Sequence, residues 1–119
     1  MLHACGKERF ILQTCAAETE LNCINPLEVP PMGDLALAQA KQMVSGTHLS
    51  LMGNLHTTYV MLFGSVAQVK AAARAAIDAA GAGGGFILST GDQCGYATPD
   101  ENIFALVETA REFGTYSTR

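Results

Sequence analysis

Short apolar runs alternate along the chain with longer segments of helical periodicity. The runs that favour strands cover residues 1–5, 22–25, 48–53 and 85–89, and a more amphipathic segment follows each of them. We predict helices over residues 7–17, 35–44 and 66–80 and from residue 98 onward, with a shorter turn near residues 58–63. Four successive strand-and-helix units predict parallel strands, because each helix must return the chain to the same end of the sheet.

Residues with strong positional preferences mark the ends of these helices. Asp34 is placed to cap the second helix, and Gly46 follows its end. Thr98 and Pro99 predict the start of the last helix, because threonine caps helices and proline suits the first helical position, and Gly114 can end it. The apolar positions that we expect the last two long helices to bury are Val66, Val69, Ala73, Ile77 and Ala80, and Ile103, Leu106, Val107, Ala110 and Phe113.

The length fits a single domain, and the composition indicates that other protein segments cover much of its surface. A chain of 119 residues is half as long as a complete (β/α)₈ barrel, which needs about 250 residues. The pattern fits a small open parallel sheet and a barrel half equally well. Apolar residues make up 49% of the chain and charged residues only 15%, which is typical of covered surfaces. Because exposed edge strands pair readily with other chains, we expect a homo-oligomer or a separate N-terminal half.

Charge and cysteine content restrict the expected partners. A net charge of -4 provides no basic surface, so we expect neither nucleic acid nor a membrane as a partner. The four cysteines form no CxxC unit, and the sequence has no signal-like segment and no apolar segment of membrane-spanning length. We therefore expect a cytoplasmic protein whose ligand is a small-molecule substrate.

Several segments resemble the uroporphyrinogen decarboxylase and corrinoid methyltransferase superfamily. They are NPLEVPPMGD at residues 25–34, LMGN at 51–54, GGFILSTG at 84–91 and TPDENI at 98–103, in the order found in that family. The resemblance spans nearly the whole chain and implies an α/β fold, with residues 1–119 as the C-terminal half of a TIM (β/α)₈ barrel, strands five to eight. Since barrel sites gather residues from the whole rim, we expect the isolated chain to be inactive.

The segment HACG at residues 3–6 resembles the HxCG motif of the corrinoid methyltransferase branch. In that branch the histidine and cysteine bind zinc, which activates a thiol that takes a methyl group from a corrinoid cofactor. His3 and Cys5 are two positions apart, so on a strand they share a face and can reach one metal ion. Without the resemblance, a histidine facing the barrel and a small buried cysteine are the alternative interpretation.

The third zinc ligand of that branch is a cysteine directly after the glycine of the last strand, and this sequence has Asp92 there. Cys94 lies two residues further on, and Gly95 would let the loop fold back so that the Cys94 thiolate reaches the metal. Asp92 can instead ligate through oxygen, or bond to nearby backbone N–H groups without any metal. The decarboxylase branch carries a histidine at this position, so Asp92 departs from both patterns.

Polar residues after the predicted strands form the expected substrate site. Glu28 follows the second strand, Asn54 and His56 follow the third, and Asp92 follows the fourth, all at the catalytic end of a barrel. The alternatives are an exposed loop carboxylate for Glu28 and a helix-capping histidine for His56.

The sequence is compatible with three functions. One is a zinc-dependent methyltransferase completed by an N-terminal half, with His3, Cys5 and Cys94 as metal ligands. Another is a decarboxylase-like lyase of porphyrin biosynthesis, which needs no cofactor. The last is a non-catalytic remnant or interaction module.

Overall fold

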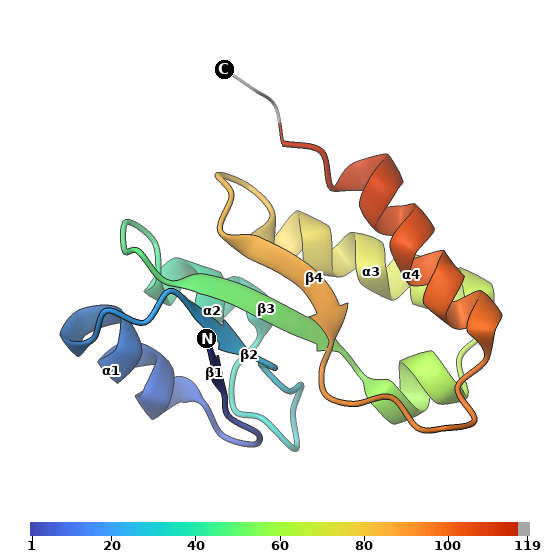
Figure 1. The fold of residues 1–119 in the computed structure, drawn as a ribbon, viewed down its shortest axis with the longest axis horizontal. Coiled ribbons are helices and arrows are strands. Elements are labelled where there is room, and N and C mark those ends of the chain that lie inside the picture. The colour runs from blue at the N-terminus through green and yellow to red at the C-terminus, as the bar shows by residue number, and fades with distance from the viewer. Residues whose placement is uncertain (117–119) are drawn as a thin grey trace.

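The computed structural model describes residues 1–116 and confirms the predicted alternation of strands and helices (Figure 1). Each crossover between strands contains a helix, and a short π-helical turn follows the third strand. The elements are β1 (Leu2–His3), α1 (Arg9–Glu18), β2 (Cys23–Asn25), α2 (Leu37–Met43), β3 (Ser50–Leu55), η1 (Thr57–Leu62), α3 (Val66–Ala80), β4 (Phe86–Thr90) and α4 (Asp100–Phe113). Among the described residues, no helix is both long and apolar enough to cross a bilayer.

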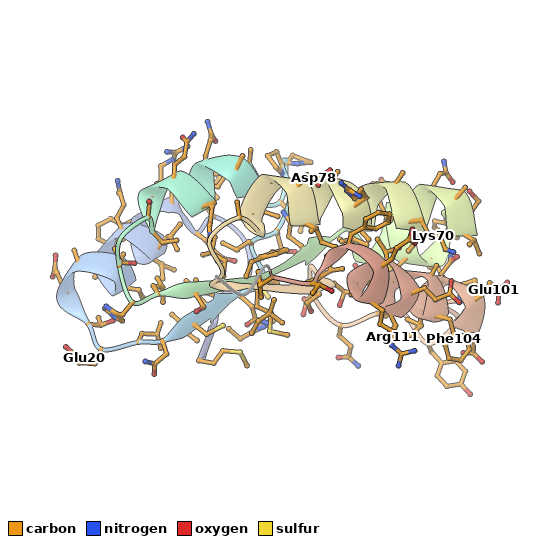
Figure 2. All side chains as sticks on the ribbon, turned by 90° about the horizontal axis from the view of Figure 1, so that it is seen from above. Glu20, Lys70, Asp78, Glu101, Phe104 and Arg111 are labelled. Atoms are coloured by element: carbon orange, nitrogen blue, oxygen red, sulfur yellow. The ribbon has the colours of Figure 1, made fainter. Side chains whose placement is uncertain are left out.

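The strands form one parallel sheet in the order β1-β2-β3-β4, which is also their order in the chain. Crossovers of one hand that always lead to the neighbouring strand place the connecting helices on the same side of a sheet. Accordingly, α2 and α3 lie over one face, and the described residues place no helix over the opposite face of β1 to β3 (Figure 2). A doubly wound sheet carries helices on both faces. The fold is therefore a segment of a (β/α)₈ barrel, as predicted.

The uncovered face of the sheet carries a row of side chains that includes the predicted histidine. Ile24, Leu51 and Phe86 are paired in register and are buried. Because successive strand residues point to opposite faces, the residues that follow these three point away from the core. With the partner of Asn25 on β1, this row consists of His3, Asn25, Met52 and Ile87.

Helix α3 lies close to the sheet because the side chains that it buries are small. The residues concerned are Val69, Ala73, Ala76 and Ala80. Three of the five positions predicted to face the sheet are therefore buried, and Ile77 is half-buried. Val66 lies in the first turn of the helix and is 39% exposed, so the predicted burial is wrong there.

Asp34 caps a different helix from the one predicted. Helix α2 begins at Leu37 with Ala36 as its N-cap, so Asp34 precedes it by several residues. The carboxylate oxygen Oδ1 of Asp34 instead accepts hydrogen bonds from the backbone N–H groups of Glu8, at 2.9 Å, and Arg9, at 3.1 Å. Asp34 thereby satisfies the first N–H groups of α1, which have no partner within that helix.

Helix α4 buries a smaller and more polar side than the apolar pattern predicts. Its N-cap is Pro99 and not Thr98. The residues that it buries are Asn102, Ala105 and Thr109, whereas the expected core positions Ile103, Val107 and Phe113 are 37%, 41% and 39% exposed. This side of α4 packs mainly on α3, and near the start of α4 the Nδ2 of Asn102 donates to the carbonyl oxygens of Met61 and Gly64 at the end of η1.

Candidate metal centre and adjoining pocket

Three side chains with metal-binding atoms meet at the carboxyl end of the sheet. His3 ends β1, Cys5 lies in the loop after it, and Asp92 lies in the loop after β4. Nε2 of His3 lies 3.1 Å from Sγ of Cys5 and 3.5 Å from Oδ1 of Asp92, and the Cys5 thiol donates to Oδ2 of Asp92 at 3.6 Å. The ligand atoms of the three residues all lie within 4.8 Å of one another. We call this group the His3–Cys5–Asp92 cluster.

The cluster joins the first strand of the sheet to the last. In a flat sheet β1 and β4 would lie three strand spacings apart, about 14 Å, which is beyond the reach of these side chains. The sheet therefore curves toward its uncovered face, as strands that close into a barrel do. The loop after β4 also turns back toward β1, and the Thr90 hydroxyl fixes this turn by donating to the Asp92 carbonyl oxygen at 2.7 Å.

The surroundings of Cys5 favour the protonated form of its thiol. Desolvation and then the negative charge of Asp92 raise the pKa of the Cys5 thiol above its ordinary value. The side chains of His3 and Asp92 are 50% and 42% exposed, so an ion can reach them from solvent. Imidazole nitrogen, thiolate sulfur and carboxylate oxygen are all donors that zinc accepts.

Reciprocal hydrogen bonds join the loop after β1 to the loop after β2. The backbone N–H of Gly6 donates to the carboxylate of Glu28, and the backbone N–H of Leu27 donates to Oε1 of Glu8 at 3.0 Å. Gly6 has a φ of 89°, a conformation that favours glycine. Glu28, a predicted substrate contact, thus also holds the segment that carries Cys5.

Glu8 is a functional candidate that the sequence analysis missed. Its side chain is only 2% exposed, and Oε2 is buried without a hydrogen-bond partner among residues 1–116. Burial raises the pKa of Glu8 to about 7, although the hydrogen bond from Leu27 lowers it, and the nearby Glu28 raises it further. A glutamate at the start of an amphipathic helix is usually exposed, so no sequence signal indicated this burial.

Three of the predicted substrate-binding residues line one cavity beside the cluster. The cavity has a volume of about 350 Å³, and its lining includes Glu28, Asn54 and His56. Gly91, the neighbour of Asp92, also lines it. Asn54 is held there because its Nδ2 donates to the carbonyl oxygen of Leu27 at 3.0 Å. We call this cavity the rim pocket.

His56 caps η1, as the alternative interpretation of its position held. Its Nδ1 accepts hydrogen bonds from the backbone N–H groups of Thr58, at 3.1 Å, and Tyr59, at 3.2 Å. An Nδ1 that accepts carries no proton, so the ring proton is on Nε2. The Tyr59 ring packs against the imidazole at a centroid distance of 4.7 Å. The ring nitrogen of His56 that η1 leaves free is therefore a hydrogen-bond donor.

Cys94 lies apart from the cluster. It is partly buried and packs against the hydrophobic core. The loop brings Asp92, and not Cys94, to His3 and Cys5.

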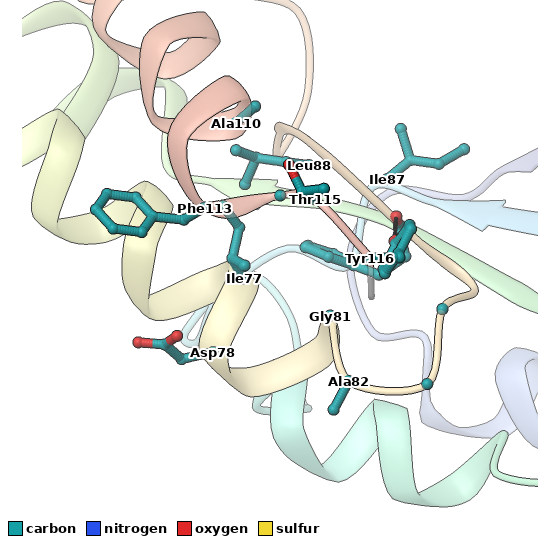
Figure 3. A pocket seen from close by; sticks show the side chains of 14 residues that line it. Ile77, Asp78, Gly81, Ala82, Ile87, Leu88, Ala110, Phe113, Thr115 and Tyr116 are labelled. Atoms are coloured by element: carbon teal, nitrogen blue, oxygen red, sulfur yellow. Dashed lines mark hydrogen bonds between the residues drawn. The ribbon is translucent and has the colours of Figure 1, made fainter. Parts of the chain in front are cut away.

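A larger cavity, of about 1070 Å³, lies at the other end of the sheet (Figure 3). Its walls are the start of β4 and the ends of α3 and α4, with Ile77, Phe113 and Tyr116 among the side chains. Asp78 is the acidic residue of this lining, and it is paired with Arg74 at 2.9 Å. Because barrel enzymes carry their chemistry at the carboxyl ends of the strands, we place the functional site at the cluster and the rim pocket.

Comparison with known proteins identifies the family. The family model described as "Uroporphyrinogen decarboxylase (URO-D)" matches residues 1–113. Two curated relatives, both named methylcobamide:CoM methyltransferase MtaA and both from Methanosarcina barkeri, are 35% and 34% identical over 95% of this chain. The chain spans only 30% of the length of these relatives.

The structural comparison agrees with these matches. A solved methyltransferase from Methanosarcina mazei superposes with a TM-score of 0.75 at 30% sequence identity, over 96% of this chain and 31% of that one. The family match and the shared fold together support the predicted resemblance. The chain belongs to the uroporphyrinogen decarboxylase family.

Proposed function

We propose that this chain supplies the metal-binding rim of a zinc-dependent methyltransferase, which transfers a methyl group from a methylated corrinoid to a thiol. The observation that carries the proposal is the meeting of His3, Cys5 and Asp92 beside the rim pocket. The two curated relatives support it, because both are named as methylcobamide:CoM methyltransferases.

The donor atoms of the cluster fit a zinc ion. Catalytic zinc sites commonly have three protein ligands and a fourth position for water or substrate. His3 would bind through Nε2, Asp92 through a carboxylate oxygen, and Cys5 as a thiolate that has released its proton. When bound, zinc supplies a Lewis acid that favours the thiolate form of a thiol substrate.

The rim pocket is the proposed substrate site. His56 presents Nε2–H to an acceptor group of the substrate, because its Nδ1 is occupied by η1. Asn54 uses its amide nitrogen on Leu27, so its amide oxygen is the group left for a ligand. In this proposal Asp92 is a metal ligand, and Glu28 holds the loop that carries Cys5.

Metal analysis tests the proposal directly. The purified chain should bind one zinc ion, and replacing both His3 and Cys5 by alanine should abolish binding. Cys23→Ala is the matched control, since Cys23 lies on β2 outside the cluster. Equal, substoichiometric zinc in the wild type and in the double variant would refute the methyltransferase proposal.

We further propose that strands from outside this chain cover the uncovered face of the sheet. Ile87 on that face and Phe104 on α4 are 50% and 63% exposed, and β1 and β4 are edge strands. Because the relatives are about three times as long, strands equivalent to their remaining part are the proposed cover. Light scattering should show self-association when this cover is absent, whereas a stable monomer at micromolar concentration would contradict the need for it.

The family match favours one second candidate, a metal-independent decarboxylase-like lyase. The discriminating measurement is the effect of a zinc chelator on the chain with a complete rim. Activity toward a carboxylated substrate that survives the chelator would favour the lyase, and loss of methyl transfer would favour the first proposal.

A further inference from the structure

The imidazole of His3 is held from behind by one side chain of the neighbouring strand. His3 and Asn25 are register partners on β1 and β2, and both point to the uncovered face of the sheet. Nδ1 of His3 lies 3.2 Å from Oδ1 of Asn25. The other ring nitrogen, Nε2, points toward Cys5 and Asp92.

The contact with Asn25 favours one position for the ring proton. An amide oxygen only accepts hydrogen bonds, so the contact requires that Nδ1 carry the proton. The neutral ring then has its lone pair on Nε2, the atom that faces the cluster. The opposite tautomer would place a proton on Nε2, where it would block metal binding. Histidine ligands generally depend on such a partner behind the ring to fix the ring's tautomer and orientation.

We propose that Asn25 is a positioning residue, which fixes His3 in the tautomer with Nε2 free for a metal ion. The inference rests on the proposed zinc site, because it assigns a role toward the ion that the cluster would hold. Among residues 1–116, Asn25 forms no hydrogen bond with Cys5 or Asp92, so its role is exerted through His3 alone.

The position of Asn25 in the sheet makes its side chain suitable for a clean substitution. Its backbone carbonyl accepts a hydrogen bond from Ala4 at 2.8 Å, and any side chain preserves this bond. Asn25→Leu keeps a similar volume and removes the acceptor. Asn25→Asp keeps the acceptor and adds a negative charge, which strengthens the hydrogen bond from Nδ1. Asn22→Ala is the matched control, since Asn22 is an exposed asparagine outside the cluster.

The first measurement is the tautomer of His3 in the metal-free chain, read from ¹⁵N chemical shifts at a pH where the ring is neutral. His3→Gln identifies the signals. We expect protonated Nδ1 in the wild type, in Asn25→Asp and in Asn22→Ala, and a shift toward protonated Nε2 in Asn25→Leu. A wild-type ring protonated on Nε2 would overturn the inference.

The second measurement is zinc affinity by competition with a chromophoric chelator. Asn25→Leu should bind zinc about 10- to 100-fold more weakly than wild type, as expected for loss of the partner behind a ligating histidine. Asn25→Asp should restore the affinity, and Asn22→Ala should match wild type. A thermal melt of each variant separates this effect from misfolding, because a merely structural residue would move the melting temperature without changing the tautomer.

The outcomes distinguish this inference from the proposed function. If wild type binds no zinc, the proposed function fails, and the tautomer measurement alone still decides whether Asn25 orients His3. If wild type binds zinc and Asn25→Leu binds it equally well with an unchanged tautomer, the inference on Asn25 is wrong and the zinc site stands.

Discussion

Replacing Glu8 by glutamine tests whether one buried carboxyl group makes the stability of this fold depend on pH. The pKa of Glu8 in the folded chain is about 7, against an ordinary value of 4.5, and burial is the main cause. The folded chain therefore binds this proton more tightly than the unfolded chain does. The resulting stabilisation is complete below pH 4.5 and is lost as the pH rises through about 7.

The size of the effect follows from that difference in pKa. At about 1.4 kcal/mol for each pH unit, a rise from 4.5 to about 7 corresponds to about 3 kcal/mol. Glutamine keeps an oxygen that can accept the hydrogen bond from the Leu27 backbone N–H. Because glutamine cannot ionise, the Glu8→Gln variant should lack this loss of stability at high pH.

Urea unfolding of the metal-free chain measures the effect. The difference in unfolding free energy between Glu8→Gln and wild type should grow in favour of the variant by up to about 3 kcal/mol, from a pH below 4.5 to one well above 7. Glu20→Gln, at an exposed position, should show a constant difference. Parallel pH profiles for Glu8→Gln and wild type would refute the reasoning.

Four other substitutions test the site and the packing. Asp92→Ala should weaken zinc binding about 10-fold or more in chelator competition, whereas Cys94→Ala should leave it unchanged, and the reverse would restore Cys94 as the third ligand. Asn102→Ala should lower the unfolding free energy by about 2–4 kcal/mol in a urea titration, because two carbonyl oxygens lose their buried donor. Gly53→Ala should cost about 1–3 kcal/mol in the same assay, because its Cβ would lie 2.2 Å from the carbonyl oxygen of Pro26, and an unchanged stability would contradict that close approach.

The sequence predicts the order and type of the elements because those depend on local signals. The four apolar runs and the helical periodicity between them needed only neighbouring residues, and the parallel pairing followed from the alternation. The HxC spacing also placed His3 and Cys5 together correctly, since both residues belong to one short segment.

Contacts between segments far apart in the chain could not be predicted from the sequence with the same certainty as the elements. The sequence left Asp92 and Cys94 as alternative third ligands, because which of them reaches His3 depends on the curvature of all four strands together and on the turn of the loop after β4. Asp34 caps α1, and Asn102 satisfies the end of η1, because unpaired backbone groups of another element lie beside them. Apolar periodicity indicates which side chains are buried, but it does not indicate which distant backbone group lacks a hydrogen-bond partner.

The place of the cluster in the curved sheet has a mechanical consequence. His3 lies on one edge strand of the sheet and Asp92 follows the other, so an ion bound to both would cross-link the two edges across all four strands. Flattening the sheet would separate the ligands and release the ion, while a bound ion would resist flattening. Metal occupancy would thus report on the shape of the whole sheet, including strands that contribute no ligand.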